Sequence, residues 1–421
     1  MIEPPRGDRA RPFHRTRGLL VVFVALGASL SGGACDPEKT GSTFGKPSPT
    51  GSTVEGSVFF DRAPASGVLV KIGVESRLTD ASGAFRFDGV SASYDLVVED
   101  EPGSFIVLPA LAQRFVNVPV QRPAQAGAWE VTLRGELEQP LAPGRELTFL
   151  LSGDGVRSID GPLDRLTVRY GPDFVARARV HAVETEATAP GAFPGKYLSY
   201  GEAEVVMTAG AQIPFRLKLE PVRDTREVDL APVMPVGFAL ESAVVMYDLG
   251  GGITRRTLLA TYGLPARVTL PLIPGFFTTR IAMRRGDETA DSGIVLVGDS
   301  PVSFVVQPPA SLAAPAPGAV VDADTSFAVS SPGGVYEHEL EPAGGQGPRV
   351  RVVTDQASVR VPWRAIGRVP PQDAKYTWRV RRLGTLRSMI DYGLVGLHND
   401  AAQSLSAKRE IVMRVPSAGG T

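Results

Sequence analysis

Short runs in which apolar and polar residues alternate recur from Thr53 to Val415, and they limit the possible folds more than any other feature. Examples are residues 54–58, 146–151 and 376–380. Alternation with a period of two places every second side chain on the same face of a β-strand. The 46 glycines and 36 prolines punctuate the sequence between such runs and disfavour helix interiors. The sequence therefore predicts an all-β protein of tandem antiparallel β-sandwich domains.

A different pattern precedes these runs. Several arginines are followed by an apolar run at residues 18–28, and small residues lead to Cys35, the only cysteine of the chain. A basic start, a short apolar stretch and small residues are typical of a secretory signal peptide. A leader that ends at a single cysteine resembles the bacterial lipoprotein signal, and Gly32 stands where that signal usually has leucine. The resemblance implies that residues 1–34 are removed and that Cys35 carries acyl chains.

The residues after this cysteine form a predicted tether. Residues 35–52 are rich in Pro, Gly, Ser and Thr and show no apolar periodicity, which is typical of a flexible linker. The formal net charge of the chain is −1, and no basic face that would bind nucleic acid is evident. We therefore expect an exported protein, anchored by lipid to a bacterial cell envelope, at the inner or outer membrane and facing the periplasm or the surface.

The first predicted domain covers residues 53–122. Its landmarks are Gly56-x-Val58, Gly67-Val68-x-Val70, Thr79-Asp80-x-x-Gly83-x-Phe85 and Tyr94-x-Leu96-x-Val98. Their order resembles the carboxypeptidase regulatory-like domain. The resemblance implies a small transthyretin-like β-sandwich that acts as a structural or carbohydrate-facing spacer without catalysis. From the residues themselves we expect a tight turn at residues 80–83, where Asp bonds the backbone and Gly permits positive φ.

The middle of the chain shows no family signature, and we interpret it as two further β-sandwiches, at residues 125–226 and 227–308. Strand-like runs separated by Gly and Pro turns support both. The expected strands include residues 129–133, 146–151, 166–170, 175–180, 203–207, 214–219, 242–247, 267–270, 279–283 and 303–306.

The last predicted domain covers residues 309–415. It resembles a bacterial fibronectin type III-like domain through three features, which are Pro315-x-Pro317-Gly318, the strand at Phe327 and the strand Tyr376-x-Trp378-x-Val380. The resemblance implies an immunoglobulin-like sandwich that serves as a spacer or as a binding module.

No motif for catalysis, for a cofactor or for a metal is complete. His338-Glu339 begins like the zinc-protease sequence HExxH, but Pro342 stands where the second histidine belongs, and the segment alternates like a strand. Asp154, Asp160 and Asp164 lie in a glycine-containing loop, which we interpret as solvated rather than calcium-binding because their spacing does not fit a calcium loop. We therefore predict no enzyme activity, no cofactor and no metal.

Two tryptophans are candidates for sugar binding. Trp129 and Trp363 could stack on sugar rings, although core packing is the favoured interpretation for aromatic residues in or beside strands. Taken together, we predict a non-enzymatic, lipid-anchored envelope protein that acts as a multi-domain spacer or adhesion-type binding module. The alternatives are a carbohydrate-binding surface lipoprotein and an accessory protein of an envelope hydrolase. The expected partners are the membrane, through Cys35, and an envelope polysaccharide or another envelope protein.

Overall fold

The structure is a computed structural model of the whole chain. It describes residues 51–60, 63–120, 129–152, 156–170, 177–187, 196–230, 232–248, 255–261, 267–298, 301–304, 306–331, 333–384, 386–395 and 402–415. The predicted leader, Cys35 and nearly all of the tether lie outside these ranges.

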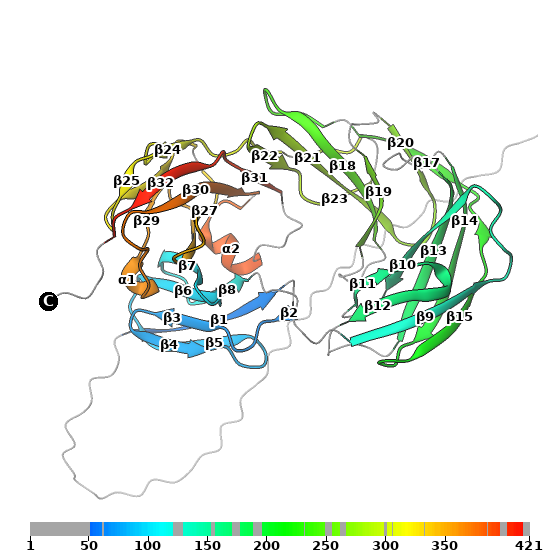
Figure 1. Cartoon of the computed structure of the whole chain (residues 1–421), viewed down its shortest axis with the longest axis horizontal. Helices are drawn as coiled ribbons and strands as arrows, with labels where there is room; N and C mark the ends of the chain where they lie inside the picture. The colour runs from blue at the N-terminus through cyan, green and yellow to red at the C-terminus, as the bar shows by residue number, and fades with distance from the viewer. Residues whose placement is uncertain are drawn as a thin grey trace, which may run out of the picture. The chain divides into compact units, whose positions relative to one another are not determined.

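Strands dominate the described residues (Figure 1), which confirms the predicted all-β fold class. The helical elements among these residues are short, and they are η1 at Leu163–Arg165, α1 at Trp363–Ile366 and α2 at Met389–Val395. No helix within the described ranges is long and apolar enough to cross a membrane.

The first segment forms eight strands, and the strand expected at residues 54–58 is present. The strands are β1 (Ser52–Phe60), β2 (Ala63–Pro64), β3 (Leu69–Ile72), β4 (Glu75–Leu78), β5 (Ala84–Val90), β6 (Tyr94–Glu101), β7 (Ser104–Leu111) and β8 (Phe115–Pro119). β1 pairs antiparallel with β5 and parallel with β8. These three strands and β2 make one sheet, whereas β3, β4, β6 and β7 belong to another.

The turn expected at residues 80–83 connects the two sheets and is present. The Oδ1 atom of Asp80 accepts hydrogen bonds from the backbone N–H groups of Ser82, at 2.8 Å, and Ala84, at 2.9 Å. Gly83 has a φ of +73°, and a Cβ atom there would lie 2.4 Å from the carbonyl oxygen of Val58. Both the backbone conformation and the close approach of β1 therefore require glycine.

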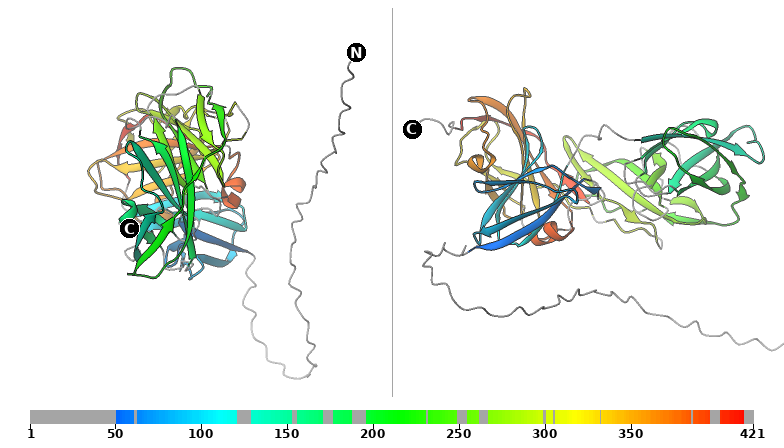
Figure 2. Two further views of the ribbon diagram at one scale, coloured as in Figure 1. Left: turned by 90° about the vertical axis from the view of Figure 1, so that its right-hand side faces the viewer. Right: turned by 90° about the horizontal axis from the view of Figure 1, so that it is seen from below.

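The sheet that contains β7 continues into the last segment of the chain. β28 (Arg349–Thr354) pairs with β7 in parallel, with Arg351 opposite Ile106. Beyond β28 the pairing runs on to β27 (Tyr336–Pro342) and β30 (Ala374–Leu383). In Figures 1 and 2 the blue and cyan strands of the first segment accordingly lie beside the orange strands of the last. We call β6, β7, β28, β27 and β30 together the shared sheet.

Both faces of β7 are buried, which explains why residues 105–108 form a continuous apolar run without alternation. Ile106 and Leu108 belong to a core that otherwise comes mainly from the first segment. Phe105 and Val107 belong to the core of the last segment. Since a run of this kind does not distinguish a doubly buried strand from a buried helix, the sequence pattern did not single out this strand.

The middle of the chain forms two further cores, one mainly within residues 131–219 and one mainly within residues 222–306. Its strands are β9 (Trp129–Leu137), β10 (Arg145–Ser152), β11 (Val156–Asp160), β12 (Leu166–Tyr170), β13 (Arg177–Glu186), β14 (Tyr197–Val206), β15 (Gln212–Leu217), β16 (Glu220–Pro221), β17 (Thr225–Asp229), β18 (Ala239–Asp248), β19 (Arg255–Thr261), β20 (Arg267–Pro271), β21 (Phe276–Arg285), β22 (Glu288–Asp291) and β23 (Val295–Leu296). β22 joins the last segment by pairing with β31.

The prediction of a strand at residues 303–306 is wrong. Val302 makes a single bridge with Leu230, and no strand covers residues 303, 304 and 306. Phe304 is nevertheless buried, and Val306 packs against the same core as Val302. The alternating pattern therefore indicated the buried side chains correctly, but the pairing with the end of β17 stops at Val302.

The last segment contains the remaining strands. Besides β27, β28 and β30 they are β24 (Leu312–Ala314), β25 (Val320–Val321), β26 (Ser326–Val329), β29 (Ser358–Arg360), β31 (Gln403–Leu405) and β32 (Arg409–Met413). The core here is centred on Trp378, which is fully buried and meets the ring of Phe327 edge-on at 5.2 Å between centroids. The domain boundaries at residues 122, 226 and 308 remain predictions.

Candidate functional site: a charged pocket on the shared sheet

The structure does not support Trp363 as a sugar-stacking residue. Trp363 opens α1, is only 4% exposed and packs in the core of the last segment, so its ring offers no face to a ligand. The carbonyl oxygen of Val361 accepts a hydrogen bond from the backbone N–H group of Trp363, which helps to fix the position of Trp363. Trp129 lies in β9, but its side chain is outside the described residues, as is Cys35.

The histidines do not form a shared site among the described residues. His338 lies on β27, His181 lies on β13 in a different sheet, and His398 lies outside the described ranges. His181 contacts the hydroxyl of Tyr200 through Nδ1 at 2.6 Å. No group of three His, Cys, Asp or Glu side chains suited to a metal occurs in the described part of the chain. Asp154 is outside that part.

His338 is instead a core residue with unusual surroundings. Its ring is fully buried and stacks on Trp378 with 6.0 Å between centroids, and neither ring nitrogen has a hydrogen-bond partner. Burial lowers the pKa of His338 to about 4 because the apolar core disfavours the imidazolium. This histidine is therefore neutral in the folded protein at neutral pH.

On β27, β28 and β30, charged side chains occupy the face opposite the tryptophan core. On β27, the residues on either side of His338 are Glu337 and Glu339, which point away from the tryptophan core. In register with them are Arg351 on β28 and Arg379 and Arg381 on β30. Opposite charges on directly opposed residues stabilise neighbouring strands.

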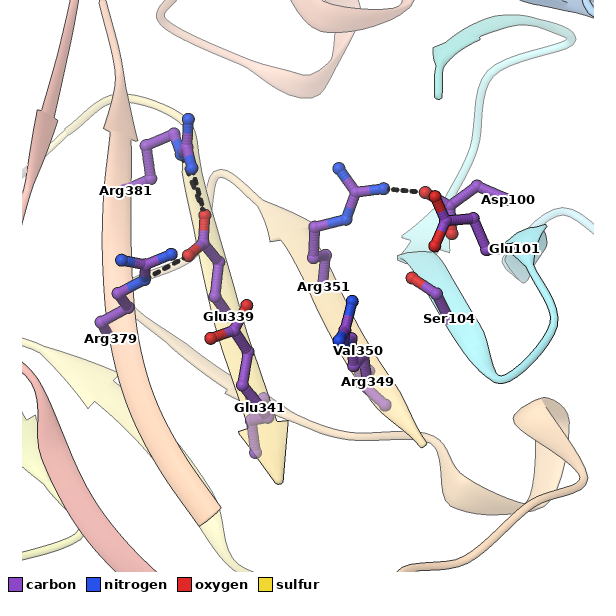
Figure 3. Close-up of a pocket in the computed structure, with 11 residues that line it drawn as sticks. Asp100, Glu101, Ser104, Glu339, Glu341, Arg349, Val350, Arg351, Arg379 and Arg381 are labelled. Carbon is purple, nitrogen blue, oxygen red and sulfur yellow. Dashed lines mark hydrogen bonds and ion pairs between the residues drawn. The ribbon is translucent and has the colours of Figure 1, made fainter. Parts of the chain in front are cut away.

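Glu339 is the centre of this group. It is paired with Arg379, and its Oε1 accepts a hydrogen bond from Nε of Arg381 at 3.0 Å (Figure 3). Arg381 also lies 3.5 Å from Glu337 and donates to the Oε1 of Gln403 at 3.0 Å. Because the Glu339 side chain is only 5% exposed, these pairs are poorly screened by solvent.

The two glutamates respond oppositely to this environment. Burial raises the pKa of Glu337, and the attraction of Arg381 offsets only part of that effect. Burial also opposes ionisation of Glu339, but the combined attraction of Arg381 and Arg379 prevails and lowers its pKa. The pair therefore favours an ionised Glu339 beside a more readily protonated Glu337.

A second ion pair connects the first segment of the chain with the last. Arg351 of β28 donates to Oδ2 of Asp100, a residue of β6 that is 251 positions away in the sequence. The register of β6 and β7 shifts between Glu99 and Glu101, which places Asp100 in a β-bulge. Bulges redirect single side chains and are frequent beside functional sites.

These groups line a cavity of about 130 Å³. The lining includes Asp100, Glu101 and Ser104 from the first segment, facing Glu339 and Arg351 from the last (Figure 3). The Asp100 side chain is only 2% exposed, and its Oδ1 atom has no hydrogen-bond partner. A buried carboxylate oxygen without a donor carries a free-energy cost.

Sequence reasoning did not find this site. The acidic residues of β27 and the arginines of β28 and β30 alternate with apolar residues, which is the ordinary pattern of a strand with one solvated face. The distant pairing of β7 with β28 brings Asp100 next to these residues. One signal could have indicated this site. Arginines recur at every second residue on two of the expected strands, and glutamates recur in the same way on a third.

The described residues define an all-β protein with several sheets, consistent with β-sandwich modules. No family model and no curated protein matches the chain. Among solved structures, the Bacillus anthracis TIE protein is similar at 11% identity, covering 87% of this chain and 67% of that chain. The TM-score is 0.16, which supports no conclusion about fold or function.

Proposed function

We propose that this protein is a non-enzymatic, lipid-anchored protein of the bacterial cell envelope, which acts as a spacer and binding module. The observation that carries the proposal is Cys35, the only cysteine, placed where an apolar leader ends. An unpaired cysteine is at risk of oxidation in an exported protein, whereas acylation would give it a use. Several acyl chains on one residue would supply the multiple hydrophobic signals that stable anchoring needs.

The fold of the described residues is compatible with this role. β1 begins at Ser52, directly after the predicted tether, and is hydrogen-bonded on both sides by β5 and β8. A tether attached to a central strand transmits force into a paired sheet rather than into a loose end. The pairing of β7 with β28 joins the last segment to the other sheet of the first segment.

Metabolic labelling with an alkyne fatty acid tests the anchor. The wild-type chain should take up label and partition into membranes, and Cys35→Ala should lose both properties. Gly32→Leu provides the matched variant, because it brings the leader closer to the lipoprotein pattern and should increase the labelled fraction. Absence of label on the wild type, or equal labelling of Cys35→Ala, would show that the proposal is wrong.

A further inference from the structure

We propose that two copies of this protein pair antiparallel through strand β4, about a two-fold axis at Ser76. β4 is the last strand along its sheet (Figure 1), and among the described residues it pairs only with β3. The proposal goes beyond the spacer and binding role and does not depend on acylation of Cys35.

The backbone of β4 presents hydrogen-bonding groups to this edge. Just after the strand, the N–H group of Thr79 donates to the carbonyl oxygen of Val68, the residue before β3, at 3.0 Å. Successive residues of an antiparallel strand point their N–H and C=O groups to alternate sides, so those of Leu78 and Ser76 point away from β3. The Ser76 carbonyl accordingly accepts a hydrogen bond from the guanidinium of Arg77, at 3.3 Å. A second strand can therefore be added at this edge.

The sequence around Ser76 is complementary to itself when a second copy runs antiparallel. With Ser76 opposite the partner's Ser76, Glu75 lies opposite the partner's Arg77, and Leu78 lies beside the partner's Val74. The two-fold axis makes each of these contacts twice. An axis at Arg77 would instead oppose two arginines, and an axis at Leu78 would leave both charges of the strand without an opposed charge. Side-chain pairing therefore selects the register centred on Ser76.

The side chains that would meet are exposed in the single chain. Val74 and Leu78 are 103% and 66% exposed, and the Glu75 and Arg77 side chains are 50% and 57% exposed. Glu75 and Arg77 form an ion pair within the strand at 3.2 Å, but an exposed pair of this kind contributes little. A second copy would give each charge a cross-strand partner and would remove apolar surface of Val74 and Leu78 from water.

β4 also lacks features by which edge strands avoid such pairing. Protected edges commonly carry lysine, proline or a β-bulge. β4 contains neither residue type, and its register with β3 continues without a shift from the pair Leu69–Leu78 to the pair Ile72–Glu75. Because the strand has only four residues, the contact is small, and we expect a reversible dimer.

The test is disulfide cross-linking of the full-length Ser76→Cys chain, with diamide as the oxidant. Opposed residues of a hydrogen-bonded antiparallel pair have Cα atoms about 5.5 Å apart, which a disulfide can bridge. Ser76→Cys should therefore form a covalent dimer on non-reducing electrophoresis, whereas the wild type, whose only cysteine is Cys35, should not. Glu75→Cys is the matched control. In this register its two copies lie more than about 7 Å apart, and it should cross-link at least about fivefold less.

Exchange of charges tests the register. In the Ser76→Cys chain, Glu75→Arg opposes arginines at both ends of the contact and should lower the dimer fraction at least about fivefold. Adding Arg77→Glu restores opposed charges in the reverse order and should restore the dimer. All three positions are exposed, so these variants test pairing rather than folding.

Three results would overturn the proposal. The first is no dimer of Ser76→Cys above the wild-type level, which would leave this edge to solvent or to a strand of another protein. The second is equal cross-linking of Glu75→Cys and Ser76→Cys, which would indicate random collision. The third is failure of Arg77→Glu to restore the dimer of the Glu75→Arg chain. Because none of these readouts involves acylation, failure of the dimer and failure of the anchor are separate results.

Discussion

Replacing the buried histidine of the shared sheet should make the protein less sensitive to acid. His338 has a pKa of about 4 in the folded chain, against an ordinary value of 6.5. The unfolded chain therefore binds more protons between these values, and the free energy of unfolding falls as the pH drops from 6.5 towards 4. A difference of this size corresponds to about 3 kcal/mol at 1.36 kcal/mol for each pKa unit.

His338→Leu removes this titration and keeps a side chain of similar size. Between pH 6.5 and pH 4, the free energy of unfolding should fall by about 3 kcal/mol less in the variant than in the wild type. At pH 7 it should be more stable by about 1 kcal/mol or more, because two ring nitrogens without partners are no longer buried. His181, whose pKa is also lowered by burial to about 4, contributes equally to both proteins and cancels in the comparison.

Denaturant unfolding followed by tryptophan fluorescence measures these free energies. Trp363 and Trp378 both lie in the core that contains His338, so the signal reports largely on that core. The reasoning is refuted if wild type and His338→Leu lose the same stability between pH 6.5 and pH 4. It is also refuted if the wild-type free energy of unfolding does not change over that interval.

Three further predictions concern stability, and thermal and denaturant unfolding check them. Glu339→Gln should cost about 3–5 kcal/mol, because two partly buried arginines lose their shared partner, and a change under 1 kcal/mol would contradict the network. Gly83→Ala should destabilise clearly more than Gly67→Ala, since both glycines have positive φ but only the first meets a backbone oxygen, at 2.4 Å, and equal effects would disprove the steric argument. Phe105→Ala should cost about 3–5 kcal/mol because the ring is fully buried, and retention of wild-type stability would show that β7 does not carry the core of the last segment.

The strands with one solvated face were predictable, because their side chains alternate. The turn at Asp80 and the strands of Trp378 and Phe327 follow directly from local sequence, and all three are present. β7 was not predictable. Its continuous apolar run indicates that both faces are buried, but it does not indicate which strands pair with its two edges.

The pocket was not predictable for a related reason. Its acidic and basic residues come from strands far apart in the sequence, and their meeting depends on the pairing of β7 with β28. The bulge that aims Asp100 at Arg351 is likewise a property of strand register, which period-two patterns do not specify. The sequence therefore indicates that these residues face away from the core, but not that another segment encloses them.

The pairing of β7 with β28 also has a consequence for biogenesis. During synthesis, β7 is complete long before its neighbour, since Asp100 and Arg351 are separated by 251 positions. For that interval β7 is an open edge with apolar side chains on both faces, the kind of edge that pairs with other chains and aggregates. Maturation of the first segment therefore depends on the arrival of the last, and a chain truncated before β28 exposes this edge permanently.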